Sequence, residues 1–183
     1  MKIFTFLFIC NFALAIDSKD PSLYVRHGIP PLPIVPKVKI EKFIGKWFLI
    51  SALPRTLFID CVAQTSEYRI LTKNSISILK TCFKEKGKTS TVKGKALVVN
   101  TITNSELEVT FENFLEKVVQ TKWDYTIFQL DKNYEFVMVG SKDRKSLSIM
   151  SRRPTMPRKV LDQYVNLAKK NGFDVSKLIY SKY

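Results

Sequence analysis

The stretch Val62–Cys82, VAQTSEYRILTKNSISILKTC, contains two short β-rich runs separated by a turn. The runs are Val62–Leu71 and Ser75–Cys82, and Lys73-Asn74 between them has the composition of a tight turn. The isoleucines of the second run are spaced two residues apart, which is the period of a strand with one buried face. This stretch therefore predicts a β-hairpin, and similar runs continue along the chain on both sides of it.

Eight such runs follow one another with links of hairpin length, among them a second predicted turn at Asp131–Asn133, and we expect all eight to be strands. This pattern predicts an all-β, antiparallel up-and-down barrel. Eight strands closed in this way leave room for their own side chains or for one small ligand. The runs are Trp47–Leu53, Val62–Leu71, Ser75–Cys82, Thr91–Val99, Leu107–Phe114, Trp123–Leu130, Tyr134–Gly140 and Ser146–Arg152.

One helix is predicted after the last of these runs. Thr155 and Pro157 are start signals, and Gly172 follows the last turn. We expect this helix to pack against the outside of the barrel, and residues 173–183 to add a short ninth strand. The apolar stripe with a 3.6-residue period consists of Val160, Leu161, Tyr164, Val165 and Ala168.

The first fifteen residues are predicted to be a secretory signal peptide. A basic Lys2 precedes the apolar run Ile3–Leu14, and Ala13-Leu14-Ala15 is a small-residue cleavage pattern. The run is too short to span a bilayer, which takes about 20 apolar residues. Cys10 lies inside the run, so we expect it to leave with the signal peptide and the exported protein to lack a lipid anchor.

Residues 16–38 form a separate, proline-rich segment that precedes the domain expected over residues 39–183. Five of the 8 prolines of the chain lie in it, four of them between residues 30 and 36. We expect an extended arm that lies on the surface or on a neighbouring molecule, the second of which would give a homo-oligomer.

Two cysteines, Cys61 and Cys82, remain after cleavage in a protein bound for an oxidising compartment. A single disulfide between them is the favoured interpretation, and two independent buried thiols are the alternative. Strict two-residue alternation across the hairpin does not determine whether both cysteine side chains lie on the same face of the sheet. The disulfide therefore requires a bulge or a loop. A metal site is disfavoured, because no histidine lies near them to complete the ligand set.

Charge and composition narrow the classes of partner. The formal net charge of +14 over 183 residues favours anionic partners, and 45% hydrophobic residues fit a packed core. No recognition helix, RNA-binding aromatic block or zinc-finger spacing accompanies the lysines, so nucleic acid is not expected. The single histidine, His27, lies in the proline-rich arm away from any nucleophile, so we expect neither an enzyme nor a cofactor.

Four short motifs give the chain a resemblance to a known family. In consistent order and spacing from about Val38 to Tyr183, the sequence resembles the lipocalin family, and within it the bacterial outer-membrane lipocalin and apolipoprotein D branch. The motifs are Gly45-Lys46-Trp47, Tyr134–Gly140 with Asp143-Arg144, Ser151–Thr155, and Gly172–Lys177.

The resemblance implies roles for three residues and a class of ligand. It makes Gly45, Trp47 and Arg152 structural, with the tryptophan closing the bottom of the barrel and the arginine packing across it. It also implies a fatty acid, a lysophospholipid or a similar amphiphile inside the barrel. A filled barrel that acts through its basic surface or its arm, on a membrane or another macromolecule, is the alternative.

The inward face follows from parity along the strands, and its residues are candidates for lining a ligand cavity or for filling the barrel. Among them Lys80 either meets an anionic head group or extends to the barrel mouth. The candidates are Gln64, Ser66, Tyr68, Ile76, Ile78, Lys80, Leu107, Val109, Phe111, Tyr125, Ile127, Phe136, Met138, Ser148 and Met150. The partners expected are a lipophilic small molecule, an anionic membrane surface and a second copy of the chain, in the periplasm or outside the cell.

Overall fold

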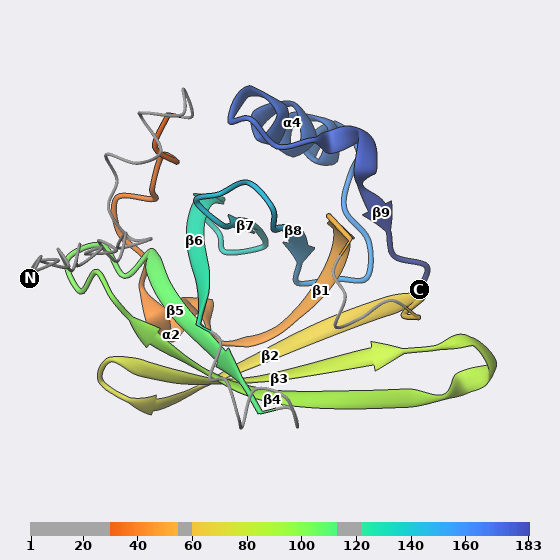
Figure 1. Cartoon of the computed structure of the whole chain (residues 1–183), viewed down its shortest axis with the longest axis horizontal. Coiled ribbons are helices and arrows are strands. Elements are labelled where there is room, and N and C mark those ends of the chain that lie inside the picture. The colour runs from red at the N-terminus through yellow and green to blue at the C-terminus, as the bar shows by residue number, and fades with distance from the viewer. Residues whose placement is uncertain (1–29, 55–59, 113–121) are drawn as a thin grey trace, which may run out of the picture.

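The predicted strands form one antiparallel sheet that closes into a barrel. The computed structural model describes residues 30–54, 60–112 and 122–183, and within them nine strands pair in the order β2-β3-β4-β5-β6-β7-β8-β1-β9 (Figure 1). A further pairing between β1 and β2 closes eight of them, so the predicted fold is confirmed. The strands are β1 (Gly45–Ala52), β2 (Ala63–Thr72), β3 (Ser75–Phe83), β4 (Thr89–Val98), β5 (Glu106–Phe111), β6 (Trp123–Leu130), β7 (Phe136–Gly140), β8 (Leu147–Ser151) and β9 (Ile179–Tyr180).

Two predicted turns join strands at one end of the barrel. At Lys73-Asn74 the flanking hydroxyls of Thr72 and Ser75 lie 2.7 Å apart. In the turn that begins at Asp131, its carboxylate accepts hydrogen bonds from three backbone N–H groups at 2.6–2.8 Å. Polar side chains that form hydrogen bonds within a turn stabilise it without help from a neighbouring strand. Both turn predictions are confirmed.

The same end of the barrel is covered by the short helix α2 (Ile40–Phe43), and we call it the closed end. Trp47 lies directly above α2, is fully buried, and donates its indole N–H to the Phe43 carbonyl at 2.8 Å. Phe43 also packs against Tyr68, with ring centroids 5.2 Å apart. These aromatic rings form the floor of the barrel interior.

Arg152, which directly follows the last residue of β8, holds this floor in place. Its guanidinium carbon lies 3.8 Å from the centroid of the Trp47 ring, and its N–H groups donate to the carbonyls of Lys46, Lys42 and Phe43 at 2.7–3.0 Å. Gly45 has φ +95°, and a Cβ there would lie 3.3 Å from Arg152 Nη1. Glycine thus fits both the backbone conformation and the space beside the arginine.

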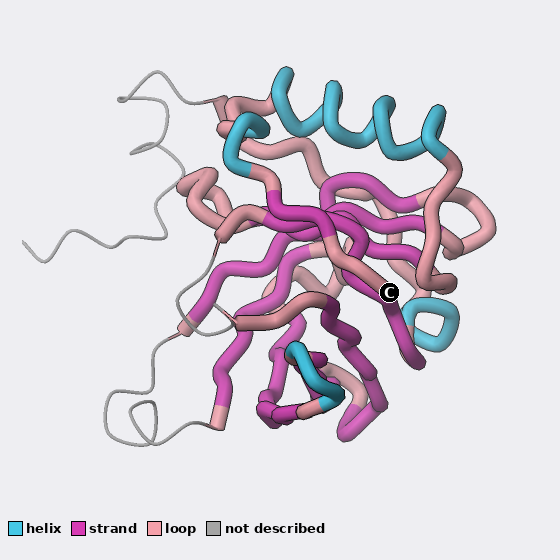
Figure 2. The backbone as a smooth tube through the Cα atoms, turned by 90° about the vertical axis from the view of Figure 1, so that its right-hand side faces the viewer, coloured by secondary structure: helices cyan, strands magenta, loops and turns pink. Residues whose placement is uncertain are grey.

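Buried side chains form two clusters, one on each face of the sheet. The interior cluster lies inside the barrel and includes Ile76, Ile78, Leu107, Val109 and Ile127. The outer cluster lies between the barrel wall and helix α4 (Arg158–Lys170). Figure 2 shows α4 lying along the outside of the strands.

Helix α4 has the predicted position and the predicted buried stripe. It begins after Pro157, and Gly172 with φ +85° follows its last turn. All five stripe residues belong to the outer cluster or pack against it, with Tyr164 and Ala168 fully inside. The 3₁₀ helix η3 (Val175–Lys177) then leads to β9, and a second 3₁₀ helix, η2 (Glu85–Gly87), joins β3 to β4.

Residues 30–38 of the proline-rich arm lie on the chain's own barrel. Val35 and Val38 donate backbone hydrogen bonds to Ile127 and Thr103, at 3.2 and 2.7 Å. Leu32 belongs to the outer cluster and Val38 to the interior cluster. This part of the arm therefore docks within one molecule, whereas residues 16–29 and the predicted signal peptide lie outside the described residues.

Candidate ligand-binding cavity

A cavity of about 150 Å³ opens at the end of the barrel opposite α2. Strands β1, β2, β3, β6 and β8 and the C-terminal segment 179–181 form its wall. The lining residues are Leu49, Ala52, Leu53, Pro54, Cys61, Val62, Gln64, Ser66, Tyr68, Lys80, Tyr125, Ser148, Met150, Ile179, Tyr180 and Ser181.

Strand alternation places the polar part of this lining. Gln64, Ser66 and Tyr68 are alternate residues of β2 and therefore share its inner face. Lys80 lies opposite Ser66 in the β2–β3 register, on the same side of the sheet. The residues between them on β2, Thr65 and Glu67, do not line the cavity.

The deepest polar group is a pair of tyrosines. The Tyr68 and Tyr125 hydroxyls lie 2.7 Å apart across the barrel, and the Tyr68 ring stands on Phe43 of the floor. The Lys80 ammonium lies 5.3 Å from the centroid of Phe111. Lys80 is the only charged residue in the described lining, so the cavity carries a positive charge without a lining carboxylate.

Apolar side chains form the outer part of the cavity. Leu53 and Pro54 follow the end of β1, and Ile179 and Tyr180 of β9 face them. The deeper part of the cavity thus holds Lys80 and the tyrosine hydroxyls, and the mouth combines these apolar side chains with the polar Gln64, Ser148 and Ser181. An amphiphile with an anionic head and an apolar chain has the matching polarity.

The C-terminal segment closes a gap in the wall between β1 and β2. Ser181 donates to the Ile50 carbonyl at 3.0 Å and Lys182 to the Val62 carbonyl at 2.7 Å, which ties the segment to both strands. Tyr183 donates to the carbonyls of Leu49 and Gln64, and burial raises the pKa of its phenol to about 12. The weak alternation of 173–183 indicated a strand here but did not indicate a cavity wall.

The disulfide between Cys61 and Cys82 is confirmed. Their Cα atoms lie 5.3 Å apart, and Cys61 sits in the loop before β2, which supplies the loop that strict alternation required. Because Cys61 also lines the cavity, the disulfide fixes the mouth-side end of β2 to β3.

The structure divides the fifteen sequence-predicted lining residues into three groups. Seven line the cavity: Gln64, Ser66, Tyr68, Lys80, Tyr125, Ser148 and Met150. Six pack in the interior cluster and fill the barrel around it: Ile76, Ile78, Leu107, Val109, Phe111 and Ile127.

The remaining two, Phe136 and Met138, correct the prediction for β7. Both pack in or against the outer cluster under α4, where the Tyr164 hydroxyl donates to the Phe136 carbonyl at 3.2 Å. Val137 and Val139 face the interior instead. The prediction from alternation was wrong here because α4 covers the outer face of β7. Both faces of the strand are therefore apolar, and the sequence pattern does not show which of them lies inside the barrel.

Three further observations concern the described residues as a whole. Within residues 30–54, 60–112 and 122–183, no three His, Cys, Asp or Glu side chains are grouped to hold a metal ion. In the same residues, no helix has the length and apolar character to cross a membrane. A second hollow of about 320 Å³, lined by Arg152, Arg153 and Met156 among others, lies outside the barrel at the start of α4.

Comparison with known proteins identifies similar chains of matching length. The family model described as a lipocalin-like domain matches residues 38–183. The outer membrane lipoprotein Blc of Vibrio cholerae is 29% identical over 177 residues, covering 96% of this chain and 95% of that protein. The temperature-induced lipocalin-1 of Arabidopsis thaliana is 26% identical, with 80% of each chain covered.

Solved structures show the same fold at low sequence identity. Insecticyanin from the tobacco hornworm Manduca sexta superposes with a TM-score of 0.63 at 14% identity, covering 84% of this chain and 85% of that one. Lobster apocrustacyanin A1 gives a TM-score of 0.59 at 13% identity, covering 77% of each chain.

Proposed function

Because this chain belongs to the lipocalin family, whose fold implies the binding of small hydrophobic ligands, we propose that it binds and carries a single-chain lipophilic anion. A fatty acid or a lysophospholipid is the ligand class. The observation that carries the proposal is the mixed lining of the cavity, in which one cation and several hydroxyls lie among apolar side chains and no carboxylate is present in the described lining.

The anionic head lies beside Lys80 in this proposal. The ammonium and the hydroxyls of Ser66 and Tyr125 are hydrogen-bond donors, which a carboxylate or phosphate requires. A head group placed there leaves the apolar side chains of the lining to contact the apolar chain.

The apolar chain lies between Leu49, Met150 and Leu53 and leaves past Ile179. Its burial supplies most of the affinity, at roughly 25 cal/mol per Å² before the costs of association. The cavity of about 150 Å³ is smaller than the roughly 300–1,000 Å³ typical of sites that enclose a whole drug-sized ligand. The far end of a long chain therefore extends into the mouth.

The proposal involves no catalysis and no cofactor. Lipocalins are generally carriers rather than enzymes, and the cavity lining contains neither histidine nor carboxylate in the described residues. Hydroxyls without a general base hold a ligand and do not activate a nucleophile.

The first test is native mass spectrometry of the purified protein with lipid extraction of the same sample. A bound fatty acid or lysophospholipid in one copy per chain is expected. In titrations, Ser148→Trp fills the cavity and is expected to weaken binding at least tenfold. Thr91→Trp, on the exposed outer face of β4, is the matched control and is expected to bind like the parent. Equal ligand affinity of the two variants would contradict the location of the ligand in this cavity.

The second test addresses the charge. Lys80→Met keeps the length of the side chain and removes its cation, so affinity for a fatty acid is expected to fall about tenfold. Affinity for the fatty alcohol of the same chain length is expected to stay within twofold. Lys93→Met, at an exposed position of β4, is the control. An equal loss for acid and alcohol would show a packing role for Lys80 and not head-group binding.

The alternative function is an interaction protein with a filled barrel. Six predicted lining residues do fill the interior, and the chain carries a net charge of +14. A protein that purifies without lipid and refuses added lipid, while it associates with anionic surfaces in a salt-sensitive way, would support this alternative.

The proposal also places the protein outside the cytoplasm. Relatives named as outer membrane lipoproteins support a location in the envelope or beyond it. Cleavage after Ala15 and the absence of a lipid anchor are read from the intact mass of the exported protein. A mass that begins at Cys10 with an added diacylglyceryl group would overturn both.

A further inference from the structure

Five large apolar side chains are exposed at the closed end of the barrel, away from the cavity. They are Ile70 (48% exposed), Leu71 (52%), Leu97 (46%), Val99 (64%) and Ile102 (81%). We call them the closed-end patch. Single exposed apolar residues are ordinary, but five large ones on neighbouring connections at one end of a molecule mark a surface that contacts something other than water.

The five residues are carried by two neighbouring connections at this end of the barrel. Ile70 and Leu71 lie at the end of β2, beside the β2–β3 turn, and the others lie at the end of β4 and in the loop that follows. Leu97 pairs with Ser75 at the start of β3, and Val98 donates to the Asn74 carbonyl of the turn at 2.9 Å. Figure 1 shows both connections projecting at the same end of the barrel.

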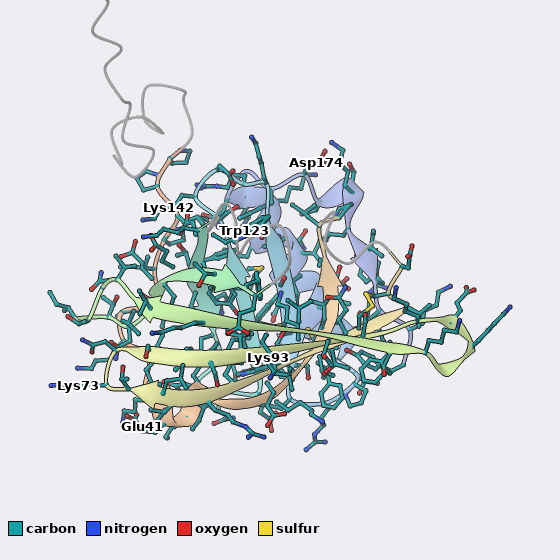
Figure 3. The ribbon with its side chains drawn as sticks, turned by 60° about the horizontal axis from the view of Figure 1, so that its bottom comes forward. Glu41, Lys73, Lys93, Trp123, Lys142 and Asp174 are labelled. Carbon is teal, nitrogen blue, oxygen red and sulfur yellow. A yellow bond between two sulfur atoms is a disulfide. The ribbon has the colours of Figure 1, made fainter. Side chains whose placement is uncertain are left out.

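Basic side chains surround the patch. Lys73 projects from the β2–β3 turn between the two connections (Figure 3). Lys95 precedes Leu97 on the same exposed face of β4. Lys37 and Lys39 flank Val38, which is hydrogen-bonded to the loop that carries Ile102 through Thr103 and Asn104.

Nearby carboxylates are largely paired. Glu106 and Glu108 of β5 form ion pairs with Lys142 and Lys122 at 2.9 and 2.8 Å, and Glu67 pairs with Arg69 at 2.8 Å. Glu41 of α2 is an exposed acid at this end. The surface around the patch thus combines exposed apolar side chains with an excess of positive charge.

We infer that the closed-end patch docks the protein on an anionic lipid bilayer. The apolar side chains of the two connections enter the interface, while the surrounding lysines contact anionic head groups. Charge complementarity favours a lipid surface, and projecting loop ends suit a soft interface better than the flat face of a folded partner. The cavity mouth at Pro54 and Tyr180 then faces the water. This inference does not depend on the ligand proposed above.

The test is sedimentation of the exported protein with vesicles of phosphatidylcholine, with and without phosphatidylglycerol. The parent is expected to bind the anionic vesicles and to dissociate at high salt. Val99→Asp with Ile102→Asp is expected to lower the partition coefficient at least tenfold. Thr89→Asp with Thr91→Asp places the same charge change at the exposed opposite end of β4 and is expected to lower it less than twofold. Equal losses in the two double variants would overturn the inference.

A gain-of-signal measurement does not depend on loss of binding. Ile102→Trp is expected to shift its fluorescence to the blue on anionic vesicles, whereas Thr91→Trp is not. Light scattering tests whether a second copy of the chain occupies the patch instead. If the parent is a dimer, if Val99→Asp with Ile102→Asp dissociates it, and if the same variant binds vesicles like the parent, the patch is a dimer interface and the inference of membrane docking is overturned. Fatty-acid affinity of this variant is expected to equal that of the parent, so that failure here is separable from failure of the carrier proposal.

Discussion

At the scale of single residues, a few side chains fasten the closed end. Trp47 is fully buried, and Arg152 both covers its ring and supplies donors to three carbonyls of the preceding segment. Burial lowers the pKa of the guanidinium, which nevertheless stays charged at any ordinary pH. One residue thus links α2 and the start of β1 to the end of β8 through hydrogen bonds to three backbone carbonyls.

Replacing the tryptophan tests this role. Trp47→Ala is expected to lower the free energy of unfolding by about 3–5 kcal/mol, because it removes a buried ring and leaves a cavity. Lys46→Ala, at the exposed neighbouring position, is the control and is expected to change it by less than about 0.5 kcal/mol. Urea denaturation measures both. A Trp47→Ala protein as stable as the parent would remove the tryptophan from the barrel floor.

Two phenols, the buried one of Tyr164 and the half-exposed one of Tyr183, predict a loss of stability at alkaline pH. Burial raises the pKa of Tyr164 and of Tyr183 to about 12, against about 10 in an unfolded chain. The folded state therefore favours the neutral phenol, so this stabilisation is complete below about pH 10 and is lost as the pH rises toward 12. Between pH 10 and 12, the parent is expected to lose more unfolding free energy than Tyr164→Phe does. If the unfolding free energies of the parent and of Tyr164→Phe fall in parallel over this pH range, the raised pKa of Tyr164 is contradicted.

At the scale of elements, the cavity wall depends on two links near the mouth. The disulfide joins the loop before β2 to β3, and the C-terminal segment joins β1 to β2 through hydrogen bonds to Ile50 and Val62. The register of β1 explains the second link. β1 pairs with β2 from Gly45 to Phe48 and then, past an irregularity before Ser51, with β9.

Removing the disulfide tests the first link. The two cysteines are separated by 21 residues, and a closed loop of that length contributes about 3 kcal/mol through the unfolded state. Cys61→Ser with Cys82→Ser is expected to lower the free energy of unfolding by that amount. Reduced parent protein is the control and is expected to match the variant. If the oxidised parent and the variant unfold at the same urea concentration, the disulfide is absent in solution.

The orientation of β7 can be tested at Met138, which separates an effect on stability from an effect on ligand binding. Met138 is fully buried in the outer cluster, so Met138→Ala is expected to cost about 2–5 kcal/mol of stability. Ligand affinity measured well below the unfolding transition is expected to remain within twofold of the parent. A tenfold loss of affinity in this variant would return Met138 to the cavity.

At the scale of the whole molecule, binding and stability are linked because the cavity exists only in the closed barrel. A ligand at 100 times its dissociation constant is expected to raise the free energy of unfolding by about 2.7 kcal/mol. Urea denaturation with and without a fatty acid measures this, and Ser148→Trp is the control that is expected to gain at most about 1.4 kcal/mol at the same ligand concentration. A parent protein that gains nothing would favour the filled barrel.

The sequence by itself determined the barrel and its floor. Alternation at period two and turn residues at regular spacing are local properties, so the eight strands, α4 and the Asp131 turn could be predicted without knowing what they pack against. The motifs around Trp47 and Arg152 likewise carried enough information to place both at the closed end. Parity on β3 selected a true cavity residue, Lys80, because the alternate residues Ser77 and Thr81 on the other face are polar.

Only the tertiary structure decided which interior positions are open and which are filled. Ile76 and Lys80 share one face of β3, but only Lys80 lines the cavity, since the room above a side chain depends on what crosses the barrel from the other strands. Helix α4 reversed the prediction for β7 by burying its outer face. The wall formed by residues 179–183 had no local signal either, because hydrogen bonds to Ile50 and Val62 arise only once strands far apart in sequence leave a gap between them.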